Sequence, residues 1–325
     1  MKSAIPLFFA LLLSTQAASA QSAGTPPPSG APVETVTSEA PKTPLEKAID
    51  GFVKSYATPS VNVGKIPRWR SGICPMTVGL TAGLNLGVTA LIRQIAAQVG
   101  APVAAKKPCN TNVNVIFTRT PQDVLDDIAK NHEGMLGFHE VSQTKRLATM
   151  SHPIQAWYVT GSRDNNGFFF VDTASRSPEC EGDLQELYNL PYFSPQWIAV
   201  FHRVYRTCKG MHVTGDRLND GLRSELSAVT IIVDASRLGE VGMKQAANYV
   251  AMLALSQTQT FEICQPLVSI VNVMTQDCSD TLKPDTLSES DIAYLGALYK
   301  MDPDVMLQSQ QAGIAHQMEA TVGKH

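Results

Sequence analysis

The sequence lacks the compact motifs that identify the commonest hydrolases and nucleotide-binding enzymes. It has no His-Glu-x-x-His string, which would place two imidazoles on one helical face for zinc. It has neither a Gly-x-Ser-x-Gly nucleophile elbow nor a Gly-x-x-x-x-Gly-Lys phosphate loop. These absences exclude the usual zinc peptidase, the α/β-hydrolase and the P-loop nucleotidase.

Cysteine spacing, charge and apolar runs exclude further classes. No two cysteines stand in Cys-x-x-Cys spacing, which disfavours a zinc site. There is no basic run and the formal net charge is −3, so we expect no nucleic-acid partner. The most apolar stretch after the N-terminus, residues 81–99, contains Arg93, Gln94 and Gln98, so we expect no transmembrane segment in the mature chain.

The N-terminus has the three parts of a secretory signal. Lys2 supplies the positive start, residues 4–13 form a short apolar core, and Ala18-Ser19-Ala20 supplies the small residues of a cleavage site. We therefore expect residues 1–20 to be removed after Ala20 and the protein to be periplasmic or secreted. Residues 21–43, rich in Pro, Ser and Thr, have little apolar mass to bury and predict a disordered spacer.

Six cysteines, an even number, read as disulfides in an exported protein. The sequence alone does not choose among the connectivities, and metal ligation is the rival interpretation. We expect pairing between nearest neighbours, which would leave no thiol for a cysteine nucleophile. The expected pairs are Cys74 with Cys109, Cys180 with Cys208, and Cys264 with Cys278.

Hydrophobic periodicity predicts an α+β fold with a mixed sheet, flanking helices and one central apolar helix. Helices are expected from Thr43, over 81–99, from Thr120 and over 243–257, and strands over 113–118, 154–160, 168–172 and 228–233. Trp197 to Arg206 fits a strand or a helix. We expect one domain over residues 44–303 and a polar tail over 304–325, which we read as a loose helix.

The C-terminal half resembles the zincin metallopeptidase fold with its zinc site missing, most strongly over residues 228–301. A buried strand leads into an apolar helix, and Leu267-Val268-Ser269-Ile270-Val271-Asn272 and Leu287-Ser288-Glu289-Ser290-Asp291-Ile292 follow. The resemblance places Asn248 and Met252 at the two zinc-histidine positions, Tyr249 at the catalytic glutamate and Thr258 at the third ligand. These side chains are poor zinc ligands or bases, so the resemblance implies a pseudoenzyme without cofactor. The whole chain also resembles exported proteobacterial proteins.

Three functions remain open from the sequence. The first is a non-catalytic binding protein whose cleft holds an extended peptide beside an edge strand. The second is a hydrolase with a non-standard site, for which His132, His139 and Asp234 are the candidate polar residues. The third is a structural protein of the cell envelope that binds other envelope proteins through its spacer and tail.

Overall fold

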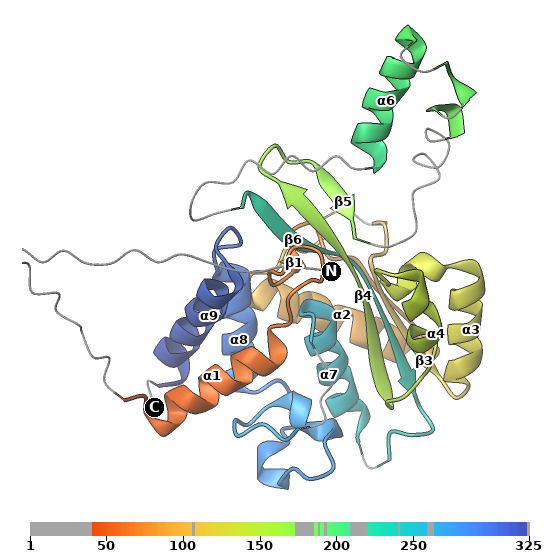
Figure 1. Ribbon diagram of the computed structural model, residues 1–325. Coiled ribbons are helices and arrows are strands. Elements are labelled where there is room, and N and C mark those ends of the chain that lie inside the picture. Colours follow the sequence, from red (N-terminus) through yellow and green to blue (C-terminus); the bar gives the residue numbers. More distant parts are fainter. Residues whose placement is uncertain are drawn as a thin grey trace, which may run out of the picture. The chain divides into compact units, whose positions relative to one another are not determined.

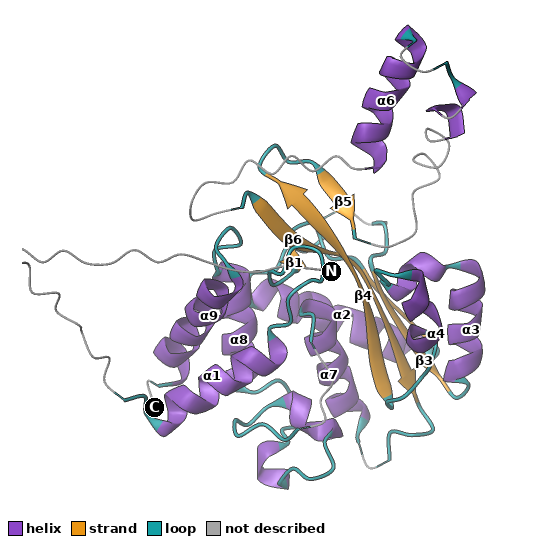
Figure 2. Ribbon diagram, viewed as in Figure 1, coloured by secondary structure: helices purple, strands orange, loops and turns teal. Residues whose placement is uncertain are grey.

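A mixed sheet is the centre of the fold, as Figures 1 and 2 show. The computed structural model describes residues 41–105, 108–172, 185–187, 189–191, 194–208, 220–239, 241–258 and 263–323. All but Pro41 of these belong to one unit, residues 42–325. The described strands are β1 Arg68–Trp69, β2 Pro75–Val78, β3 Val113–Thr118, β4 Ile154–Asp164, β5 Phe169–Val171 and β6 Leu222–Asp234.

The strand order is β2-β3-β6-β4-β5. The short strand β1 pairs with β6 on the same side as β3, next to the end of β3 along β6. Strands β1, β2, β3 and β6 run parallel, whereas β4 runs antiparallel to β6 and β5 antiparallel to β4. Strand β6 is therefore central, which explains why its second half, from Val229 to Asp234, is buried on both faces.

Helices cover both faces of the sheet. The described helices are α1 Pro44–Tyr56, α2 Ala82–Gln98, α3 Pro121–Asn131, α4 Thr144–Leu147, α6 Pro195–Cys208, α7 Met243–Leu255, α8 Glu289–Lys300 and α9 Leu307–Val322, with short 3₁₀ helices η1 Glu133–Leu136 and η3 Ile270–Met274 among them. Of these, α1, α2, α7, α8 and α9 lie on one face of the sheet and α3 on the other. Residues 197–206, left open by the sequence, lie in α6.

Successive side chains of each strand point to opposite faces, so the sheet separates two cores. Val229, Ile231 and Val233 of β6 enter the larger core with α1, α2, α7, α8 and α9. Ile232, between them, enters a smaller core with Trp157 of β4 and the residues of α3 and η1. The predicted α+β fold with a mixed sheet, flanking helices and a buried apolar helix is confirmed.

The predicted start of the first helix is also confirmed. The Thr43 hydroxyl accepts from the Glu46 backbone N–H at 3.2 Å, and the Glu46 carboxylate accepts from the Thr43 N–H at 2.6 Å. This capping box satisfies two N–H groups that have no partner within the helix.

Residues 304–325, expected as a polar tail, contain α9, whose Ile314, Ala315 and Met318 are buried in the larger core.

Two of the three expected disulfides are confirmed. Cys74 is bonded to Cys109, and Cys264 to Cys278. Cys180, and with it the expected bond to Cys208, lies outside the described residues, as do the predicted signal peptide and residues 21–40 of the spacer. In the part of the chain that the structure describes, no helix is long and apolar enough to cross a membrane.

Candidate functional site

Helix α7 is the buried element around which the candidate site is built. It follows β6 directly along the chain, and every residue from Ala246 to Leu255 is buried. Because the last carbonyls of a helix have no partner within it, a buried end needs outside donors. Trp69 Nε1 donates to the Ala254 carbonyl at 2.8 Å, the Tyr299 hydroxyl to that of Leu255 at 2.6 Å, and the Tyr158 hydroxyl to that of Leu253 at 3.1 Å.

A small cleft lies between α7 and β4. Its cavity volume is about 90 Å³, below the roughly 300–1,000 Å³ of sites for small molecules, so it fits one side chain better than a whole metabolite. The cleft is lined by residues of the start of β4, of α7 and of the segments after it: His152, Pro153, Ile154, Gln155, Ala156, Tyr158, Tyr249, Leu253, Thr258 and Met274.

The start of β4 is an edge of the sheet at this cleft. The Asp234 N–H donates to the Pro153 carbonyl, and Ile154 is the register partner of Val233. In an antiparallel pair, successive residues direct their backbone N–H and C=O groups alternately toward and away from the partner strand. The N–H and C=O of Gln155 therefore face β6, while those of Ile154 and Ala156 face away from it. Strand β5 pairs only with residues 161–163, and no other described strand pairs with this side of β4.

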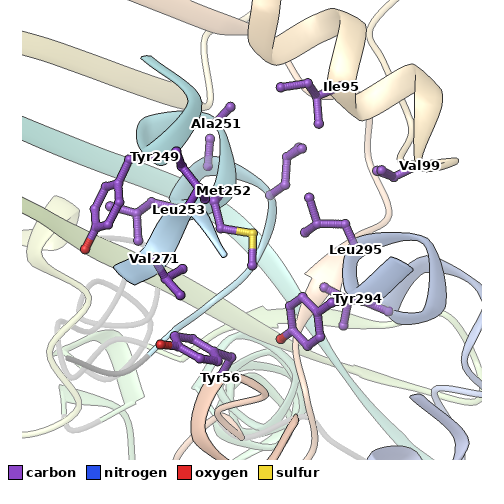
Figure 3. Close-up of a cluster of buried hydrophobic side chains, with 14 of the residues drawn as sticks. Tyr56, Ile95, Val99, Tyr249, Ala251, Met252, Leu253, Val271, Tyr294 and Leu295 are labelled. Carbon is purple, nitrogen blue, oxygen red and sulfur yellow. The ribbon is translucent and has the colours of Figure 1, made fainter. Parts of the chain in front are cut away.

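The structure separates the four positions assigned from the zincin resemblance. Tyr249 and Thr258 line the cleft. The Asn248 amide instead donates to the Lys244 carbonyl at 2.8 Å, and its oxygen accepts from the Leu287 N–H at 3.2 Å. Met252 is fully buried, and Figure 3 shows its side chain directed toward α8 in the core, away from Tyr249. The four side chains therefore do not converge on one point.

The hydroxyl groups at the cleft are poor bases. Burial raises the pKa of Tyr249 and of Tyr158 well above the ordinary value of 10.0, so both stay protonated at neutral pH. The Thr258 hydroxyl lies 3.5 Å from that of Tyr158. The Tyr158 hydroxyl already donates its proton to the Leu253 carbonyl, and a protonated phenol does not remove a proton from water.

The three polar residues proposed for a hydrolase have different surroundings. His132 is exposed at the C-terminal end of α3. His139 Nδ1 lies 2.7 Å from the Asp172 carbonyl, to which it donates because a carbonyl only accepts. Asp234 accepts from the Ser236 N–H and hydroxyl and so holds the loop after β6. No hydrogen bond joins any two of the three.

Metal ligands do not gather in the described part of the chain. Among those residues, no group of three or more His, Cys, Asp or Glu side chains is arranged to hold an ion. The sulfur atoms of four described cysteines are joined in two disulfides, which favours the disulfide interpretation over metal ligation for these positions.

The sequence did not single out the buried carboxylate of Asp291 as a site residue. This carboxylate accepts from the hydroxyls of Ser269 and Ser288 and from the backbone N–H groups of Ile270 and Ser288. It therefore joins the segment before η3 to the start of α8, the two segments on which the zincin resemblance rests. Its place at the third position of a capping box was the available signal.

The cleft residues Ile154, Ala156 and Met274 were also missed by sequence reasoning.

Comparison of the chain with protein-family models, with curated proteins and with solved structures found no match. The geometry of the site is therefore the basis for any function assigned to it.

Proposed function

We propose that this protein is a non-catalytic, exported binding protein that holds an extended peptide along the edge of β4. The observation that carries the proposal is the cleft in which the edge at Ile154 and Ala156 faces Tyr249 and Leu253 of α7. An extended peptide is the ligand whose own N–H and C=O groups match those of a sheet edge.

The size and chemistry of the cleft favour such a ligand. A peptide strand paired with Ile154 and Ala156 would place every second side chain on the same side. One of these would enter the cleft, where aliphatic and aromatic groups of Leu253, Met274 and Tyr249 surround it. The roughly 90 Å³ available suits one aliphatic side chain.

The proposal includes the zincin-like fold without its zinc chemistry. Two features support that resemblance: β6 leads through a loop into α7, and β4 pairs antiparallel with β6. Asn248 and Met252 support the loss of catalysis, because one is bonded to backbone groups and the other is in the core. Two disulfides are compatible with an exported protein.

A substitution at the edge tests the proposal. Ala156→Pro removes the N–H that faces away from β6, while the ladder bonds of Gln155 and Trp157 stay. Peptides selected from a random heptapeptide library by wild-type protein should lose about tenfold in affinity for this variant, which corresponds to about 1.4 kcal/mol. Ala156→Ser, which keeps the N–H, is the matched control and should bind as wild type does.

Two results would overturn the proposal. One is the same peptide affinity in Ala156→Pro and Ala156→Ser, which would separate binding from the edge. The other is one zinc ion per purified chain together with peptide hydrolysis that Asn248→Ala abolishes, which would make the protein an enzyme.

A further inference from the structure

The open part of the β4 edge is short. Ile154 and Ala156 direct their backbone groups away from β6, and the same alternation makes Tyr158 the next outward residue along the strand. Beyond it the edge is already covered by β5 and the residue that follows β5, because the Asp172 N–H donates to the Thr160 carbonyl at 2.8 Å. A ligand strand can therefore pair with β4 only before Thr160.

Gly137, directly after η1, closes the edge one step earlier, at Tyr158. A Cβ atom added to Gly137 would lie 1.8 Å from the Tyr158 carbonyl oxygen, so the glycine backbone lies against that outward carbonyl. The neighbours of this glycine, Leu136 and Phe138, are both buried in the smaller core and hold it in place. A strand paired with Ala156 therefore meets Gly137 where its next paired residue would lie.

The residues before β4 limit the edge at its other end. The His152 N–H, two positions before Ile154, donates to Gln155 Oε1 at 3.3 Å, and the Ser151 N–H donates to the same oxygen at 2.9 Å. These donors are therefore engaged within the chain instead of extending the ladder. Within β4 and the residues before it, the groups open for pairing are the N–H and C=O of Ile154 and Ala156.

We infer that the ligand of this edge is a short peptide that pairs through three residues and ends at Gly137. The inference rests on the proposed function and adds the length of the ligand to it. A strand that pairs with both Ile154 and Ala156 contributes three successive residues, of which the first and third lie opposite these two. A longer extended chain, such as an internal segment of an unfolded protein, cannot run on past Tyr158.

The same geometry determines which ligand side chain enters the cleft. Residues that lie opposite one another in a sheet project to the same face, whether the strands are parallel or antiparallel. The first and third ligand residues therefore share the face of Ile154 and Ala156, toward Tyr249 and Leu253 of α7, and the middle residue projects to the other face. The cavity of about 90 Å³ holds one of the two outer side chains, so sequence preference should lie at an outer position.

Isothermal titration calorimetry of the full chain with peptides of different length tests the inference. A heptapeptide selected by the wild-type protein is shortened to its three contact residues, with acetyl and amide caps, and this tripeptide should keep its affinity within about threefold. Thr-Val-Thr-Val, which favours an extended backbone, is then added to one end or to the other. The addition that runs toward Gly137 should weaken binding about tenfold or more, because the extended chain meets the glycine backbone.

Both additions are measured, because the direction of the bound strand decides which end faces Gly137. A tenfold loss from either addition supports the inference, and unchanged affinity with both would overturn it. A middle residue whose replacement by alanine costs more than that of either outer residue would also overturn it. Weaker binding by Ala156→Pro than by Ala156→Ser, together with tolerance of both additions, would leave the edge site standing and remove only the length limit. Equal binding by these two variants is instead the failure of the proposed function itself.

Discussion

The Asp291 carboxylate accepts a hydrogen bond from the backbone N–H of Ile270 at 2.8 Å, across 21 residues of sequence. The same oxygen accepts from the Ser288 N–H, also at 2.8 Å. Asp291→Ala should lower the free energy of unfolding by about 2–4 kcal/mol, because two backbone donors lose their partner. Asp291→Asn is the control, since its amide oxygen can still accept from them while its nitrogen faces the Ser269 hydroxyl. Urea denaturation at fixed pH measures both.

Asp291 should also make stability depend on pH. Burial raises the pKa of this carboxyl above its ordinary value of 3.8. The folded state then binds the proton more tightly than the unfolded state, so the contribution is fully present below about pH 3.8 and is lost as pH rises through the raised pKa. The unfolding free energy of wild type, relative to that of Asp291→Asn, should therefore fall between pH 4 and neutral pH. A relative rise over this range would show that the four hydrogen bonds outweigh burial.

The donors at the end of α7 should each contribute to stability. Trp69→Phe leaves the Ala254 carbonyl without its partner, and Tyr299→Phe does the same for Leu255. Each should cost about 1–3 kcal/mol, the usual penalty for one buried unpaired polar group. Tyr294→Phe is the matched control, because its buried hydroxyl has no hydrogen-bond partner, so its removal should be neutral or stabilising. Thermal and urea unfolding of the three variants would measure these contributions.

The two described disulfides should differ in their contribution. The bond between Cys74 and Cys109 closes a separation of 35 residues, and that between Cys264 and Cys278 one of 14. The chain-entropy relation gives about 4 kcal/mol for the first and about 3 kcal/mol for the second. Paired Cys→Ala substitutions, compared by urea denaturation under oxidising conditions, should show the larger loss for the first pair. A larger loss for the second pair would indicate that its native contacts matter more than loop closure.

Local signals predicted the elements that carry them within a few residues. The apolar run of 243–257 gave α7, and Thr43 with Glu46 gave the start of α1, because capping and periodicity are properties of neighbouring residues. Strand β1 carries no such signal. It is only two residues long, and its pairing of Trp69 with Leu226 depends on residues more than 150 positions away.

The candidate site was harder to predict for the same reason. Tyr249 and Thr258 were named from their positions in a resemblance, and both line the cleft. Ile154 and Ala156 were not, because which backbone groups face outward follows from the register between β4 and β6. Similarly, Met252 was placed at a ligand position by its spacing, whereas the packing of α7 against α8 decides where its side chain points.

The closure of α7 by Trp69, Tyr158 and Tyr299 has a kinetic consequence. The three hydrogen bonds span 185, 95 and 44 residues along the chain. Contacts between such distant residues form late, since the chain between them must first be brought together. The helix can form early by itself. Its final turn becomes protected from water only after the N-terminal, middle and C-terminal parts of the chain have docked. Its amides should therefore report the last cooperative step of folding.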